Sequence, residues 1–62
     1  MQLMVWQLRT QRGLTLRQLE KLSGISKSQL NAIENGQANP TVYTLEHIAD
    51  ALGVQLIELF AD

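Results

Sequence analysis

The sequence predicts an all-α fold, a compact bundle of five short helices within one domain of residues 1–62. Four glycines and a single proline divide the 62 residues into short segments. Within these segments apolar residues recur at helical spacing, and Val, Ile and Thr are too sparse for strands. A chain this short buries only about 60% of the surface that it exposes when unfolded, so it holds one small core.

The first two helices are predicted on either side of Gly13. The first covers residues 3–12, and Gly13 suits the left-handed conformation that often follows a helix end. The apolar residues at helical spacing are Met4, Val5 and Leu8 within it and Met1 just before it. The second helix begins after Thr15, which forms a capping-box pattern with Gln18, and ends at Gly24. Its apolar face comprises Leu16, Leu19 and Leu22.

Two further helices follow. The third begins after Ser26, which repeats the capping-box spacing with Gln29, and ends at Gly36. Its buried residues are Leu30 and Ile33, with Ile25 packed at its start. After a loop around Pro40, Thr41 caps the fourth helix, which ends at Gly53. The buried face of the fourth helix comprises Val42, Leu45, Ile48, Ala49 and Leu52.

Residues 56–60 are most simply a fifth, short helix, although their near alternation also allows a strand. Because the core is small, we expect Ile57 and Phe60 to lie at a subunit interface. Trp6 lies beside the apolar face of the first helix, so it either anchors a dimer or partner or closes the edge of the core. His47 has no second ligand at metal-binding spacing, and we expect it to be exposed.

Only residues 24 and 25 separate the second and third helices, so these two must cross at a large angle, as in a helix-turn-helix. The run from residue 13 to residue 60, GLTLRQLEKLSGISKSQLNAIENGQANPTVYTLEHIADALGVQLIELF, resembles the helix-turn-helix domain of phage repressors and Cro, the XRE family. Its recurring pieces are the GLT opening, the Gly24 turn, the IENG end of the third helix, the NP loop and the AxxLGV close. The resemblance implies a lambda-repressor-like fold and a DNA-binding transcriptional regulator, which we expect to be a repressor that binds a palindromic operator as a dimer.

The charges of the chain are separated along the sequence. All five Lys and Arg residues precede residue 28, and five of the six Asp and Glu residues follow residue 33. With Glu20 counted, residues 1–31 carry +4 and residues 32–62 carry −5. This pattern is either chance clustering of solvated charges or an anion-binding face.

Cations stand at two helix starts, where partial positive charge disfavours them. Arg17 and Lys27 lie in the first turns of the second and third helices, beside the hydroxyls of Thr15 and Ser26. An external phosphate would reverse the sign of this effect, whereas otherwise both side chains extend into water. Asn35 either contacts phosphate or caps its helix, and Tyr43 either donates to phosphate or flanks the loop. The candidate phosphate-binding residues are Thr15, Arg17, Ser26, Asn35 and Tyr43.

The outward face of the third helix is short, polar and nearly uncharged, so it is either a plain solvated face or a face that closely approaches base edges. The resemblance implies that it is the recognition helix, with base-reading residues Lys27, Ser28, Gln29, Asn31 and Ala32. Glu34 stands unfavourably at the end of this helix, so we expect a cationic partner, and the resemblance implies that the partner is Arg9. This pair is structural.

Two positions depart from the family. Leu16 stands where the family usually has a phosphate-contacting glutamine, and Glu20 stands where it has a small alanine between the second and third helices. We expect Glu20 either to tilt outward or to pair with Lys21 or Lys27.

Other functional classes have little support. The chain has no cysteine and one histidine, and it lacks a glycine-rich phosphate loop and paired acids in an apolar setting, so we expect no catalysis, cofactor or metal. No apolar run is long enough for a membrane span or signal peptide, and we expect a cytoplasmic protein. The predicted partners are double-stranded DNA and a second copy of the chain. The alternative is a protein-interaction module, such as an antitoxin or accessory subunit that docks on a partner protein.

Overall fold

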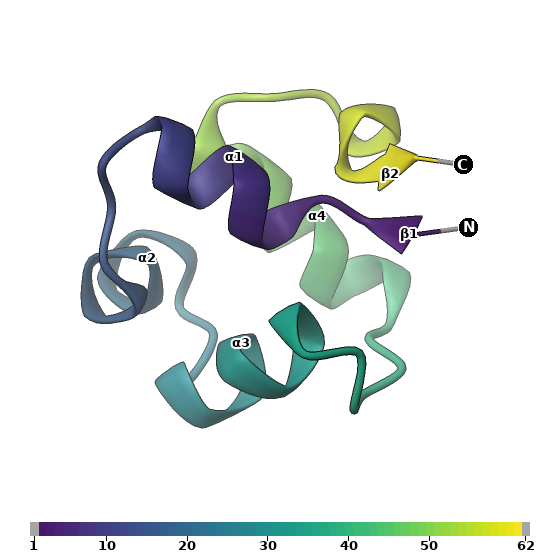
Figure 1. The fold of residues 1–62 in the computed structure, drawn as a ribbon, viewed down its shortest axis with the longest axis horizontal. Helices are drawn as coiled ribbons and strands as arrows, with labels where there is room; N and C mark the ends of the chain where they lie inside the picture. Colours follow the sequence, from purple (N-terminus) through teal and green to yellow (C-terminus); the bar gives the residue numbers. More distant parts are fainter. Residues whose placement is uncertain (1, 62) are drawn as a thin grey trace.

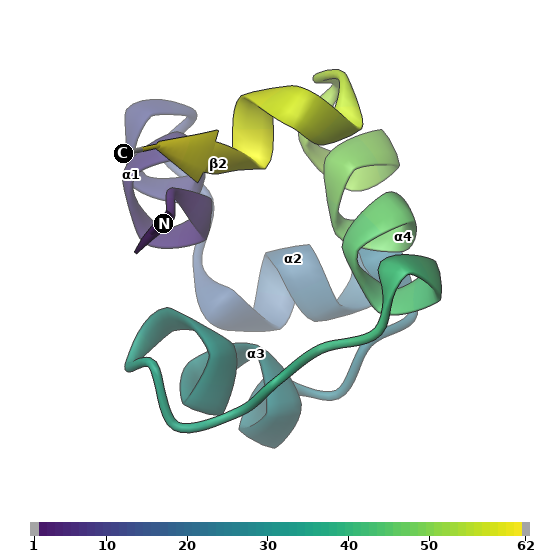
Figure 2. The ribbon, with the colours of Figure 1, turned by 90° about the vertical axis from the view of Figure 1, so that its right-hand side faces the viewer.

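A computed structural model describes residues 2–61 of the chain, so Met1 lies outside the described residues. The elements are β1 (Gln2–Leu3), α1 (Val5–Gln11), α2 (Leu16–Ser23), α3 (Lys27–Glu34), α4 (Val42–Leu52), the 3-10 helix η1 (Leu56–Leu59) and β2 (Phe60–Ala61). Figures 1 and 2 place α3 at one side of the molecule and the segment from η1 to β2 at the other. The compact helical class is as predicted, but the structure has four α-helices in residues 2–61 rather than five.

Side-chain caps begin the three helices that follow α1. The hydroxyls of Thr15, Ser26 and Thr41 accept hydrogen bonds from the backbone N–H three residues later, at 3.1, 3.2 and 3.2 Å. These bonds satisfy amides that have no partner within the helix. At the other ends of α2 and α4, Gly24 (φ 76°) and Gly53 (φ 71°) adopt the left-handed conformation, which a side chain would strain.

The tail differs from the predicted fifth helix. Only Leu56–Leu59 is helical, as a single 3-10 turn, and Phe60 continues in an extended conformation. A segment this short cannot offset the cost of starting an α-helix. The tail instead pairs its backbone with the N-terminal residues, where Leu3 stands opposite Phe60 and the N–H of Met4 donates to the carbonyl of Leu59 at 2.7 Å.

The same pairing corrects the start of the chain. The helix predicted over residues 3–12 is shorter, because Gln2–Leu3 forms an antiparallel strand with Phe60–Ala61 before α1 begins. Both described ends of the chain therefore lie side by side (Figure 1).

A core of aliphatic side chains joins all the helices. Its buried members are Val5, Leu19, Ile25, Leu30, Ile33, Leu45, Ile48, Ala49, Leu52 and Leu59. Two residues predicted on apolar faces are instead exposed, Leu22 by 60% and Val42 by 61%. Leu22 falls at the edge of the α2 face that buries Leu19 and Ser23, and Val42 is the first residue of α4, at the edge of its buried face. No helix within residues 2–61 is long and apolar enough to cross a membrane.

Candidate nucleic-acid interface

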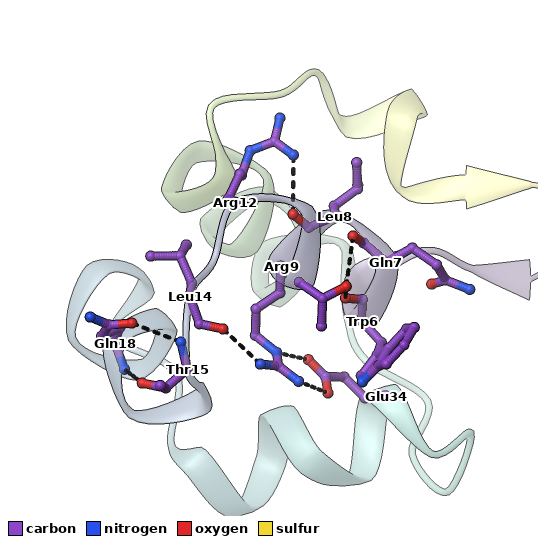
Figure 3. A network of polar contacts seen from close by, with 10 residues as sticks. Trp6, Gln7, Leu8, Arg9, Arg12, Leu14, Thr15, Gln18 and Glu34 are labelled. Carbon is purple, nitrogen blue, oxygen red and sulfur yellow. Dashed lines mark hydrogen bonds and ion pairs between the residues drawn. The ribbon is translucent and has the colours of Figure 1, made fainter.

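The guanidinium of Arg9, on α1, joins three parts of the chain (Figure 3). Its Nε donates to Glu34 Oε2 at 2.7 Å and its Nη2 donates to Glu34 Oε1 at 3.0 Å, so both carboxylate oxygens are engaged. Its Nη1 donates to the carbonyl of Leu14 at 2.7 Å, in the loop before α2. The planar fork of arginine suits this double contact, which a lysine could not reproduce.

This ion pair is largely shielded from water. The side chains of Arg9 and Glu34 are 12% and 4% exposed. The hydrogen bond with Glu34 raises the pKa of Arg9 above its ordinary value, although burial of the guanidinium opposes the rise. The carboxylate at the end of α3 thus has a cationic partner that offsets its unfavourable position in the helix dipole. The pair secures one end of α3 against α1.

A second arginine is also used within the fold. Nε of Arg12 donates to the carbonyl of Leu52 at 2.7 Å and its Nη1 donates to the carbonyl of Leu8 at 3.1 Å. It therefore satisfies a carbonyl in the last turn of α4, which the sequence alone did not indicate. The cations without these structural bonds, Arg17, Lys21 and Lys27, all lie on α2 and α3. Three acids, Glu46, Asp50 and Glu58, lie on α4 and η1.

Four of the five predicted base-reading residues are exposed on α3. Lys27, Ser28, Gln29 and Asn31 are exposed, while Ala32 is only partly so. The opposite face of the helix buries Leu30 and Ile33 in the core. Because the core fixes that face, the outward side chains are held in one orientation. Their amide and hydroxyl groups can both donate and accept hydrogen bonds.

The predicted phosphate-binding residues are also exposed, although several already have a local contact. Thr15 and Ser26 accept the capping bonds of α2 and α3, and Asn35 ends α3 through its backbone N–H. The ring of Tyr43 lies edge-on to His47, with 4.3 Å between centroids. Arg17 is exposed in the first turn of α2. Within residues 2–61, no group of His, Cys, Asp and Glu is placed to hold a metal ion.

The carboxylate of Glu20 lies at the start of α3. Its Oε2 accepts a hydrogen bond from the backbone N–H of Lys27 at 3.0 Å, across the turn between α2 and α3. This contact is neither the outward tilt nor the pairing with a lysine ammonium that we expected for Glu20. The N–H of Lys27 is therefore already bonded to an anionic group of the chain itself.

A groove of about 840 Å³ opens between α1 and the end of α3. Arg17, Lys21 and Lys27 do not line it. Trp6, which is 53% exposed, Pro40 and Phe60 are among its lining residues. Oε1 of Gln7 is buried without a hydrogen-bond partner in the described structure, and Gln7 also lines the groove. Phe60 packs against the core, whereas Ile57 on η1 is 76% exposed.

Comparison with known proteins agrees with this arrangement. Residues 7–59 match the family model described as helix-turn-helix. The chain belongs to this helix-turn-helix family. The resemblance to XRE-type regulators is thereby confirmed. The solved structure of the restriction-modification controller protein C.AhdI from Aeromonas hydrophila superimposes with a TM-score of 0.88 at 36% identity, over 90% of this chain and 85% of that one.

Two known proteins are similar to this chain in sequence. The uncharacterised HTH-type transcriptional regulator y4dJ of Sinorhizobium fredii is 48% identical over 52 residues, which are 84% of this chain and 68% of that protein. The immunity repressor protein of Bacillus phage phi105 is 43% identical over 49 residues, 79% of this chain. The matched part is 34% of the phage repressor's length.

We expect the Arg9 and Glu34 substitutions to be strongly coupled. Arg9→Met leaves a buried carboxylate without its partner and should lower the free energy of unfolding by about 3 to 5 kcal/mol. Glu34→Gln keeps the shape but loses the charge-assisted bonds, at a cost of about 1 to 3 kcal/mol. Thermal and urea unfolding of both single variants and the double variant measures the coupling.

Arg17→Met, which removes an exposed arginine, is the matched control and should change stability by no more than about 0.5 kcal/mol. If the effects of the Arg9 and Glu34 substitutions are simply additive, the two side chains do not interact in solution.

Proposed function

We propose that this protein binds double-stranded DNA sequence-specifically as a small transcriptional regulator of the repressor type, with α3 in the major groove. The observation that carries the proposal is the exposed, nearly uncharged face of α3, with Lys27 in its first turn, in a chain of the helix-turn-helix family. Two relatives bear the names of a transcriptional regulator and an immunity repressor. In this proposal the protein regulates transcription in the cytoplasm by binding DNA, without catalysis or a cofactor.

The outward side chains of α3 have the chemistry needed to distinguish base pairs. Asparagine and glutamine can pair with adenine, lysine with guanine, and serine with several acceptors, while a methyl group can touch thymine. We assign base reading to Lys27, Ser28, Gln29, Asn31 and Ala32. Ala32, which is only partly exposed, offers the methyl group.

Phosphate contacts fix the position of the protein on the duplex. The start of α2 is the strongest candidate, because Arg17 is exposed beside helix amides that the Thr15–Gln18 capping box does not use. We assign the other phosphate contacts to the exposed side chains of Ser26, Asn35 and Tyr43.

We further propose that the protein binds as a symmetric dimer through the side that carries exposed Ile57. The molecule measures 27 × 21 × 19 Å. Two touching copies can hold their recognition helices about 34 Å apart, one turn of B-DNA, only if those helices lie away from the contact. Ile57 belongs to η1, which is separate from α3 (Figure 2), so a side-by-side contact through Ile57 leaves both recognition helices uncovered on one face of the dimer.

Selection of bound sequences from a library of random duplex DNA tests the proposal as a whole. We expect an enriched inverted repeat whose half-sites are one helical turn apart. Failure to enrich any sequence, even at low salt, would favour the alternative class, a module that docks on a partner protein.

Arg17→Ala should weaken binding to the selected duplex and to random DNA by a similar factor. A phosphate contact contributes affinity whatever the sequence, so the log–log slope of affinity against salt should become shallower by about one unit per protein–DNA half-site. Fluorescence anisotropy between about 50 and about 300 mM salt measures both the affinity and its salt dependence. An unchanged slope would remove Arg17 from the phosphate-binding residues.

Asn31→Glu should abolish selective binding while leaving the fold intact. Asn31 is exposed in the middle of α3, and glutamate is the better helix former, but it brings a carboxylate to the groove. We expect the selected duplex to lose at least about 2 kcal/mol of binding free energy. Gln11→Glu, which adds the same charge at an exposed position of α1, is the control. A folded Asn31→Glu variant with unchanged affinity would mean that α3 is not in the groove.

Ile57→Glu should shift the protein from dimer to monomer. A charge on this exposed apolar side chain would be desolvated in the interface, while the fold, which does not bury Ile57, should keep its stability. Sedimentation equilibrium of both proteins at high micromolar concentration measures the effect. If the unsubstituted protein is monomeric with and without the selected duplex, the dimer is wrong.

A further inference from the structure

The two helices of the helix-turn-helix begin differently. At α2, Thr15 and Gln18 cap each other reciprocally, with the side chain of Gln18 accepting from the N–H of Thr15 at 2.8 Å. At α3, Ser26 accepts from the N–H of Gln29, and the N–H of Lys27 bonds to a residue of the preceding helix, Glu20. The start of α3 is therefore tied to α2 by a side chain.

Glu20 holds both sides of the turn. Its backbone carbonyl accepts from the N–H of Gly24 at 2.9 Å, which ends α2, and its carboxylate accepts from the N–H of Lys27, which begins α3. Between these bonds, Ser23 Oγ accepts from the N–H of Ile25 at 3.1 Å. A carboxylate at a helix start is doubly favourable, as an acceptor and through the helix dipole.

We propose that Glu20 is a specificity-determining positioning residue, which fixes the angle of α3 to α2 and so raises the ratio of selective to random DNA binding. Base reading depends on the orientation of α3, whereas phosphate contacts tolerate small rotations. Releasing the start of α3 should therefore weaken the selected duplex more than random DNA. The inference rests on the proposed role of α3 as the recognition helix.

Glu20→Gln and Glu20→Ala separate the hydrogen bond from the charge. Both variants lose the negative charge, but only glutamine keeps an oxygen that can accept from Lys27 N–H. Glu46→Gln, on α4, is the control for the change in net charge alone. The probes are the duplex selected from the random library and a scrambled duplex of the same length and composition.

We expect the ratio of the two affinities to stay within about twofold of the unsubstituted protein in Glu20→Gln and Glu46→Gln. In Glu20→Ala it should fall by about three- to tenfold, since the cap is lost. An unchanged ratio in Glu20→Ala overturns the proposal. An equal loss in Glu20→Gln also overturns it, because the charge and not the hydrogen bond would then set selectivity.

Amide hydrogen exchange at Lys27 tests the contact without DNA. Exchange should be at least about tenfold faster in Glu20→Ala than in Glu20→Gln, with the remaining core amides unchanged. Exchange in Glu20→Ala equal to that in the unsubstituted protein would show that the carboxylate does not hold α3 in solution, whatever DNA the protein binds. If no duplex is selected although Lys27 is protected, the contact stands and the proposed function is wrong, and the selectivity role falls with it.

Discussion

The ion pair between Arg9 and Glu34 is the interaction on which the arrangement of the helices depends. With its third bond, to the carbonyl of Leu14, Arg9 joins α1, the loop before α2 and the end of α3. These elements are short, so their own helical stability is low, and most of their order comes from tertiary contacts. A single planar guanidinium can bond to three acceptor oxygens, two of Glu34 and one of Leu14, because it presents five donors in fixed directions. The neighbouring Arg12 plays a similar role between α1 and the end of α4.

Much of the fold could be predicted from the sequence because its signals are local. The capping residues Thr15, Ser26 and Thr41 and the glycines that end α2 and α4 act within a few residues, and the structure uses them as caps. The capping box forms at Thr15 and Gln18, whereas at α3 only the bond from the N–H of Gln29 to Ser26 is present. The tail could not be predicted in this way. Its conformation depends on pairing with residues at the other end of the chain, and no local pattern in residues 56–60 encodes that partner.

The candidate site was predictable to the extent that it depends on helix faces. The periodicity of α3 identifies its outward side chains, and a carboxylate at a helix end calls for a cation such as Arg9. Two features were outside the reach of that reasoning. Arg12 bonds to a carbonyl 40 residues away, and Glu20 bonds to a backbone amide, which has no side-chain signature. Formal charge counts therefore overstate the cations left for a ligand, since two of the five serve the fold.

Taken together, these contacts tie α3 at both ends by carboxylates. Glu20 reaches from α2 to its first amide, and Glu34, at its last residue, reaches to Arg9 of α1. The first carboxylate is favoured by the helix dipole, whereas the second opposes it and depends on its arginine. Because Glu20, Arg9 and the core hold both ends and the buried face of α3, its outward side chains are fixed in orientation and still open to a ligand. A helix of eight residues, too short to be stable alone, can thus present its polar face in one orientation.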